Sequence, residues 1–370
     1  MPDDRPVPLD EYPVHQVPLS MKYVATGDRN AYDRCIFHVL DHEGQALLIL
    51  GLGVYPNLGV IDAYATLRLG DTLHAVRASD ALRDDDRTDL GVGPLRILVE
   101  RPLRDFVVSC EAAPDDPDGL SYEITWTADF PALWEPHHLQ RRGGRLTLEG
   151  RRFVQAGHCD GWIRVGGREI RVQGWTGTRD RSWGVRPVPG EQGGRFAEEQ
   201  PTEGFHWIWC PVRFEDRFLM VIVQEDADGH RSLNDATLVR PGHRDRQLGW
   251  PQAEITYHPG TRRPEHALVH LGDVRKPMEL EVEVLTSSPL ALGAGYPPAD
   301  DWQHGTWQGR DWTDRRTYDL SREHPLAAFG VTDHAARFRL DGRVGHGIFE
   351  HGSFGRHDPS GFTGFDSVAP

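Results

Sequence analysis

The chain has 370 residues, which is enough for one large domain or two ordinary ones. Hydrophobic residues make up 38% and charged residues 26%, a balance typical of a globular protein and not of a disordered one. The formal net charge of −15 argues against binding nucleic acid through its phosphates and against docking on an anionic membrane, because both need clustered basic residues.

The start of the chain has no basic segment followed by an apolar run, and the apolar runs elsewhere are too short to span a bilayer. We therefore expect a cytoplasmic protein without an integral membrane segment. Cys35, Cys110, Cys159 and Cys210 are dispersed and form no Cys-x-x-Cys pair, so we expect reduced core cysteines and no disulfide framework.

In the first part of the chain, short segments rich in β-branched and aromatic residues are bounded by Gly, Pro or Asp. They predict strands at 33–40, 45–51, 60–69, 95–100, 106–111 and 122–126. The segment 131–140 is a candidate for a short helix. The Arg/Gly run at 141–145 interrupts the pattern and predicts a boundary between domains 1–145 and 146–370.

The second part continues in the same way, with strands expected at 151–155, 162–165, 170–175, 205–211, 218–225, 253–257, 278–285, 337–340 and 345–350. A short helix is expected at 325–331, and the Gly- and Pro-containing stretch 185–204 predicts a long loop that could serve as a lid. Many closely spaced strands with little helix predict an all-β protein, either a sandwich or a barrel.

Tryptophan is concentrated after residue 150, where nine of the eleven lie. Trp is large enough to wall a cavity, and its ring face attracts positive charge. Core and corner positions of a β fold are the ordinary alternative for any one of them. The concentration nevertheless favours an aromatic-lined pocket in the second domain, with Trp175, Trp183, Trp207, Trp209, Trp302 and Trp307 as candidates for substrate binding.

The segment 174–186 supplies the first candidate for an acid. If it stays extended, alternation places Asp180 on the face opposite Arg179 and Arg181, so that the carboxyl faces inward and both guanidinium groups reach solvent. Burial among apolar groups would raise the pKa of Asp180 and leave it able to donate a proton. The sequence also fits a turn in which Asp180 caps backbone amides and pairs with Arg186, itself a candidate for substrate binding.

Two further segments contribute candidate catalytic residues. In a strand at 345–352, Glu350 lies on one face and His351 on the other; Glu350 could act as acid, base or supporting partner, and His351 could donate or relay a proton. At 203–209, alternation separates His206 from the neighbouring tryptophans. Each of these residues can equally be structural, and a histidine on an apolar face more often belongs to the core.

Nineteen histidines raise the question of a metal, but no His-Glu-x-x-His occurs, and the His137–His138 pair has only Glu135 as a nearby acid. We therefore expect no metal site. The glycine-containing stretch 51–56 lacks the third glycine and the helix of a dinucleotide-binding loop, and neither a phosphate-binding loop nor a Gly-x-Ser-x-Gly elbow occurs. No organic cofactor is expected.

Several motifs resemble a known family. GVYPNLGVIDAY (53–64), VRAS (76–79) and GPLRI (93–97) are similar to the first half of bacterial proteins related to hydroxyneurosporene synthase, the carotenoid 1,2-hydratases and their AttH-type relatives. TRDRSWG (178–184) and GHGIFEHG (345–352) are similar to the second half. The resemblance covers almost the whole chain and implies two lipocalin-like antiparallel β-barrel domains packed together around a hydrophobic cavity.

The resemblance also implies water addition to an isoprenoid double bond without metal or organic cofactor, with Asp180 as the buried acid that protonates the alkene. Relatives tend to have Asp-His followed by an aromatic residue, whereas this chain has an arginine after Asp180 and so lacks that histidine. His206 or His351 could take its place. Tyr55, within the first motif, joins the candidates for substrate binding.

The residues and the resemblance together predict a cofactor-independent, acid-catalysed enzyme. It would act as a hydratase or lyase, an isomerase or a cyclase on a small hydrophobic molecule such as an isoprenoid, a steroid or an aromatic compound. A non-catalytic carrier of a hydrophobic ligand is the alternative, because many barrels only enclose their ligands. Metal-assisted hydrolysis is a third hypothesis, and whether two copies form a homodimer is left open.

Overall fold

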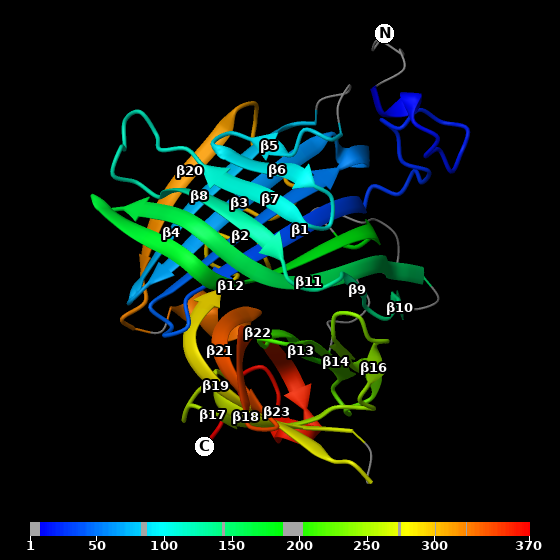
Figure 1. The fold of residues 1–370 in the computed structure, drawn as a ribbon, viewed down its shortest axis with the longest axis vertical. Helices are drawn as coiled ribbons and strands as arrows, with labels where there is room; N and C mark the ends of the chain where they lie inside the picture. Colours follow the sequence, from blue (N-terminus) through cyan, green and yellow to red (C-terminus); the bar gives the residue numbers. More distant parts are fainter. Residues whose placement is uncertain are drawn as a thin grey trace.

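The computed structural model describes residues 8–82, 87–142, 145–187, 203–272, 275–299, 301–322 and 324–370. Its strands form two large curled sheets in which neighbouring strands are antiparallel (Figure 1). Helical structure in these residues is limited to the short 3-10 turns η1 (Pro8–Glu11), η2 (Pro56–Leu58), η4 (Pro325–Phe329) and η5 (Asp358–Ser360). The predicted all-β class is confirmed. The described residues contain no helix with the length and hydropathy needed to cross a membrane.

The first sheet has the order β20-β4-β3-β2-β1-β12-β11-β8-β7-β6-β5, with β9 and β10 also paired to β11. Its strand β20 comes from late in the chain and pairs with β4 at the edge of the sheet (Figure 1). The bounds are β1 (Ala31–Leu40), β2 (Ala46–Tyr55), β3 (Val60–Leu69), β4 (Thr72–Ala81), β5 (Gly91–Val92), β6 (Leu95–Arg101), β7 (Asp105–Cys110), β8 (Ser121–Ala128), β9 (Leu133–Trp134), β10 (His138–Arg142), β11 (Arg145–Val165), β12 (Arg168–Val185) and β20 (Trp312–Asp319).

The second sheet has the order β16-β15-β14-β13-β22-β21-β19-β18-β17, with β23 paired to β22. Its bounds are β13 (Gly204–Arg213), β14 (Phe218–Asp226), β15 (Arg231–Val239), β16 (Arg246–Gln247), β17 (Gln252–Tyr257), β18 (Pro264–Leu271), β19 (Met278–Pro289), β21 (Thr332–Leu340), β22 (Arg343–His357) and β23 (Phe362–Thr363).

Some segments differ from the sequence-based expectations. The helix predicted at 131–140 is wrong, because β9 and the start of β10 occupy this segment and both pair with β11. The second helix candidate contains η4. β11 and β12 belong to the first sheet although they follow position 145, so the chain enters the second sheet later, between Val185 and Gly204. Most of the lid predicted at 185–204 lies outside the described residues.

The two sheets pack against each other over a shared apolar layer. Every residue of β2 is buried, because one face of this strand, including Leu48, lines the core of the first sheet while the other, including Ile49, faces the second sheet. The shared layer joins Ile49 to Trp209 of β13 and Ile348 of β22. A third apolar cluster, with Phe338, fills the inside of the second sheet. Alternation along a strand therefore decides which of these compartments a side chain enters.

Candidate active site

A pocket of about 230 Å³ lies between the two sheets, next to the shared apolar layer. Ile36 of β1 and Asp180 of β12 line it from the first sheet, and Trp207 of β13 and Glu350 of β22 line it from the second. The aromatic lining consists of Tyr32, Phe205, Trp207 and Tyr296, and the basic lining of His138, Arg151, Arg152 and Arg186. The pocket thus brings together four of the site residues predicted from sequence, namely Asp180, Glu350, Trp207 and Arg186.

Strand register explains why Asp180 faces the pocket. Asp180 lies between Ile36 of β1 and Val154 of β11, whose side chains belong to the layer between the sheets. Arg179 therefore points the other way, into the first sheet, where its guanidinium lies 4.3 Å from the ring centre of Phe106 and the residue is only 3% exposed. The prediction that both flanking arginines reach solvent is wrong for Arg179, because the face opposite Asp180 is the interior of the first sheet.

Burial dominates the electrostatics of Asp180. It raises the pKa of Asp180 to about 6, although the guanidinium of Arg152, with Nε 3.6 Å from Oδ2, acts to lower it. Asp180 sits inside a regular strand and its neighbouring cation is Arg152, so the alternative of a turn in which Asp180 pairs with Arg186 does not hold. At pH 7 most of the Asp180 carboxyl is ionised and can accept a proton.

Glu350 reaches the same layer from the second sheet, because it lies opposite Trp209 in the register of β13 and β22. Burial and the neighbouring Asp333 carboxyl raise the pKa of Glu350 to about 8, while the indole N–H of Trp207, which donates to Oε1, acts in the other direction. Asp333 is itself buried and hydrogen-bonded to Glu350, and burial raises its pKa to about 7. Two carboxyl groups in hydrogen-bond contact need a shared proton, so this pair holds one at neutral pH.

Polar contacts continue from Asp333 across the apolar layer into the first sheet. His38 Nε2 lies 3.1 Å from Asp333 Oδ2, and His38 Nδ1 lies 3.0 Å from the hydroxyl of Thr178. Burial lowers the pKa of His38 to about 4, so the ring is neutral. When the Thr178 hydroxyl donates to Nδ1, Nε2 carries the hydrogen and donates to Asp333. His38 and Asp333 therefore position Glu350 from behind, without lining the pocket themselves.

A further buried carboxylate, Glu135, does not line the pocket but contacts His138, which does. Its Oε1 accepts a hydrogen bond of 2.6 Å from the indole of Trp209, and its Oε2 lies 2.8 Å from His138 Nε2. Burial alone would raise the pKa of Glu135, but Arg152 and the hydrogen bonds from His138 and Trp209 outweigh burial and lower it. Trp209, a candidate for substrate binding, is thus held behind the pocket as a partner of Glu135.

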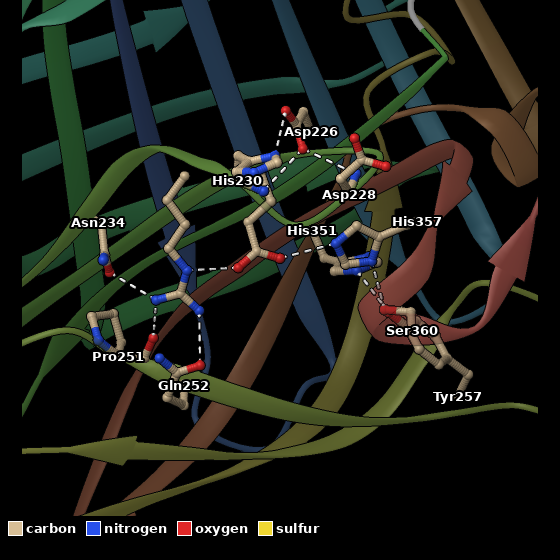
Figure 2. A network of polar contacts seen from close by, with 12 residues as sticks. Asp226, Asp228, His230, Asn234, Pro251, Gln252, Tyr257, His351, His357 and Ser360 are labelled. Atoms are coloured by element: carbon tan, nitrogen blue, oxygen red, sulfur yellow. Dashed lines mark hydrogen bonds and ion pairs between the residues drawn. The ribbon is translucent and has the colours of Figure 1, made fainter.

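The two predicted catalytic histidines lie inside the second sheet and not in this pocket. His206 stacks on His357 with ring centres 4.2 Å apart, and His351 Nε2 lies 3.3 Å from the hydroxyl of Tyr257. Figure 2 shows the network around His351, His357 and Tyr257. Strand alternation is the cause, because each histidine directly neighbours a residue that faces the shared layer. Neither histidine can therefore stand beside Asp180 in place of the histidine expected from the resemblance.

The other aromatic candidates also lie outside the pocket. Trp183 is three positions from Asp180, so it points to the opposite face, where it is 36% exposed and contacts the ring of Trp134. Trp175 packs against the core of the first sheet, and Tyr55 accepts a hydrogen bond from Arg34. Trp302 is buried beside His304, whereas Trp307 is exposed. The pocket is consequently richer in basic groups and poorer in indole rings than the sequence predicts.

Sequence analysis did not identify Asp333, His38, Arg152 or Tyr296. His38 carries a local signal, since it is an ionisable residue between Phe37 and Val39 in a predicted strand, whereas Asp333, between Thr332 and His334, carries none. Arg152 and Tyr296 carry none, because their positions depend on how distant segments pack.

Two groups among the described residues could offer three ligands to a metal ion. One comprises the exposed Asp226, Asp228 and His230, which are labelled in Figure 2. The other comprises the buried His206, Glu225 and His357. In the buried group, Glu225 is already engaged by Arg231 at 2.7 Å and by His357 at 2.9 Å. The rings of His206 and His357 are parallel to within 1°, so their in-plane lone pairs do not converge on one point.

Comparison with known proteins adds a family and a fold. A family model described as a family of unknown function (DUF8625) matches residues 7–363. The chain belongs to this family. No curated protein matches the DUF8625 chain in sequence.

The crystal structure of a putative AttH from Nitrosomonas europaea resembles this DUF8625 protein with a TM-score of 0.57 and 14% identity, over 94% of this chain and 99% of the other. This similarity confirms the predicted two-domain, lipocalin-like fold. Kievitone hydratase from Nectria haematococca has a TM-score of 0.49 and 12% identity, over 87% of this chain and 89% of the other. CghA has a TM-score of 0.45 and 13% identity, over 89% of each chain.

Proposed function

We propose that this protein is a cofactor-independent enzyme that moves protons on a small molecule held between the sheets, with Glu350 as the acid and Asp180 as the base. One observation carries the proposal. The buried Asp180 and the part-buried Glu350 line one pocket, and their surroundings separate their pKa values to about 8 for Glu350 and about 6 for Asp180. Between these values Glu350 is protonated while Asp180 is ionised, so one group can give a proton and the other can take one.

The pair fits additions to double bonds and their reversal. Glu350 gives its proton to one alkene carbon, and the electron pair of the double bond forms the new C–H bond. Water attacks the cationic carbon as Asp180 removes a proton from that water, which completes a hydration. The reverse sequence is elimination. If Asp180 instead takes a proton from a neighbouring carbon, the double bond moves and the reaction is an isomerisation. The ring faces of Trp207 and Tyr296 would stabilise the cation by about 0.5–2 kcal/mol per contact.

The lining favours a substrate with both apolar and polar parts. The volume of about 230 Å³ is below the roughly 300–1,000 Å³ of sites for drug-sized ligands, so the pocket suits a small molecule or one end of a longer one. The aromatic rings of the lining suit an unsaturated or aromatic body. Arg151, Arg152 and Arg186 supply donors for an oxygen-bearing group on that body. We therefore propose an oxygenated isoprenoid or aromatic compound in preference to a pure hydrocarbon.

The test begins with the molecule that travels with the purified protein, identified by mass spectrometry. The protein is incubated with it in D₂O, and deuterium on carbon and loss of starting material are followed. We expect turnover by the wild type, and a fall of about 10²- to 10⁴-fold in Asp180→Asn and in Glu350→Gln with ligand binding retained. Glu281→Gln, which changes an exposed carboxyl of β19, is the matched control.

Two outcomes would contradict the proposal. Full activity in Glu350→Gln would remove Glu350 as the acid, and full activity in Asp180→Asn would remove Asp180 as the base. A ligand that is bound tightly and returned unchanged would instead support the non-catalytic carrier.

A further inference from the structure

A second pocket, of about 80 Å³, lies on the other side of β21 and β22 and shares no lining residue with the candidate active site. Pro264 at the start of β18, His334 of β21 and Ser353 of β22 line it from the second sheet, together with Arg263, which directly precedes β18. Arg68 of β3 lines it from the first sheet. The turn η4 and the segment before it complete the wall, with Arg322 and His324.

The lining is strongly basic in a chain with a net charge of −15. Arg68, Arg262, Arg263 and Arg322 contribute guanidinium groups, and His324, His334 and His351 contribute imidazoles. None of the lining residues within the described ranges is acidic; Glu323 lies outside those ranges. Two carboxylates act on Arg68, namely Asp71, which contacts Arg68 Nη2 at 3.3 Å and is 72% exposed, and Asp319.

Three lining residues have buried polar atoms that find no hydrogen-bond partner within the described part of the chain. These atoms are Nε of Arg68, Nε2 of His334 and Oγ of Ser353. His334 is fully buried, and its other ring nitrogen, Nδ1, lies 2.7 Å from the hydroxyl of Ser287. When that hydroxyl donates to Nδ1, Nε2 carries the hydrogen. Buried donors are rarely left unpaired, so these atoms point to a ligand that accepts hydrogen bonds.

Arg263 completes the set of donors. Arg263 lines the pocket together with Arg68 and His334. Its charge helps to lower the pKa of both groups, after burial as the main cause. No ion-pair partner for the Arg263 side chain occurs among the described residues. Arg262 differs, because its guanidinium donates to backbone carbonyls such as those of Ser353 and Gly355 and thereby supports the wall.

We propose that this pocket binds a small oxyanion of the phosphate class, held by Arg68, Arg263, His334 Nε2 and Ser353 Oγ. Two guanidinium groups match the charge and the several acceptor oxygens of such an anion. Neutral His334 and the Ser353 hydroxyl add donors at the buried end. The small volume suits inorganic phosphate itself, or the phosphate end of a metabolite whose remainder stays outside.

The test is isothermal titration calorimetry of the full chain with inorganic phosphate, repeated with a phosphomonoester such as phenyl phosphate, at constant ionic strength. We expect saturable binding by the wild type and a loss of about tenfold or more in affinity in Arg263→Gln. Arg263 is exposed, so this variant keeps the fold. Arg168→Gln, an exposed arginine of the first sheet at the β11–β12 turn, is the matched control and should bind as the wild type does.

The two ligands distinguish the sources of the anion. Tighter binding of inorganic phosphate indicates a free anion, and tighter binding of phenyl phosphate indicates an end group; either result supports the site. The imidazole signals of His334, followed by NMR, should shift to a higher pKa when the anion binds, because its charge favours the protonated ring. Absence of saturable binding, or an equal loss in Arg263→Gln and Arg168→Gln, would overturn the proposal. Neither result bears on the acid and base of the other pocket.

Discussion

Replacing Glu350 by Gln should change how the stability of the protein depends on pH. Glutamine imitates the protonated carboxyl in size and keeps an oxygen that accepts the hydrogen bond from Trp207. In the folded chain the pKa of Glu350 is raised from 4.5 to about 8. At about 1.4 kcal/mol per pH unit, this change corresponds to about 5 kcal/mol for Glu350 alone, and the raised pKa of Asp333 is a separate contribution.

The sign follows from proton uptake. Between pH 4.5 and pH 8 the folded state holds a proton at Glu350 that the unfolded state has lost, so the free energy of unfolding falls as pH rises through this window. In Glu350→Gln the group no longer titrates, and this part of the decline disappears. The variant should therefore equal the wild type near pH 4.5 and exceed it by up to about 5 kcal/mol at pH 8.

The assay is urea unfolding followed by tryptophan fluorescence at pH 4.5, 6, 7 and 8, with the free energy of unfolding extrapolated to water. Glu281→Gln serves as control, because its carboxyl is exposed and the variant should run parallel to the wild type at every pH. If the curve of Glu350→Gln is also parallel to that of the wild type, Glu350 does not hold a proton at neutral pH. The assignment of Glu350 as the acid would then be refuted.

Three further predictions concern the same pocket. The rate of turnover should be highest near pH 7, falling below about pH 6 as Asp180 gains a proton and above about pH 8 as Glu350 loses one, and a pH–rate profile measures both limits. Trp207→Phe removes a hydrogen bond that favours the ionised form of Glu350, so the alkaline limit of the pH–rate profile should move to higher pH. An unchanged alkaline limit would contradict a hydrogen bond between Trp207 and Glu350. Arg152→Met removes the cation that opposes protonation of Asp180 and Glu135. The acidic limit should then move to higher pH, and denaturant unfolding at pH 7 should show a loss of about 3–5 kcal/mol, as expected when a buried charge loses its partner.

Strand alternation is the part of the site that sequence reasoning could predict. The period of two correctly separated Asp180 from Arg179, Glu350 from His351 and His206 from Trp207, and the structure places the members of each pair in different compartments. Alternation cannot say which compartment is which. Both faces of the central strands are buried here, so the face opposite Asp180 is a core and not solvent, and Arg179 is buried within it.

Contacts between distant segments could not be predicted. The cation beside Asp180 is Arg152, on a strand that sequence analysis placed in the second domain, and its approach depends on the pairing of β11 with β12. The number of tryptophans after residue 150 failed to predict the lining of the pocket for a related reason. Indole rings after residue 150 are shared among the interior of the first sheet, the layer between the sheets and the surface, so their number says little about any one pocket.

The proposed acid depends on the packing of two sheets and not on either sheet alone. Glu350 and Asp333 come from the second sheet, but the partner of Asp333, His38, comes from β1 of the first. The first sheet helps to bury both carboxyl groups, and without it the part of their pKa shift that burial causes would be reduced. The same contact buries Asp180, which comes from the first sheet and is covered by the second. Each sheet thus supplies one member of the proposed acid–base pair and helps to bury the member that the other sheet supplies. The proposed chemistry at neutral pH would therefore require both sheets.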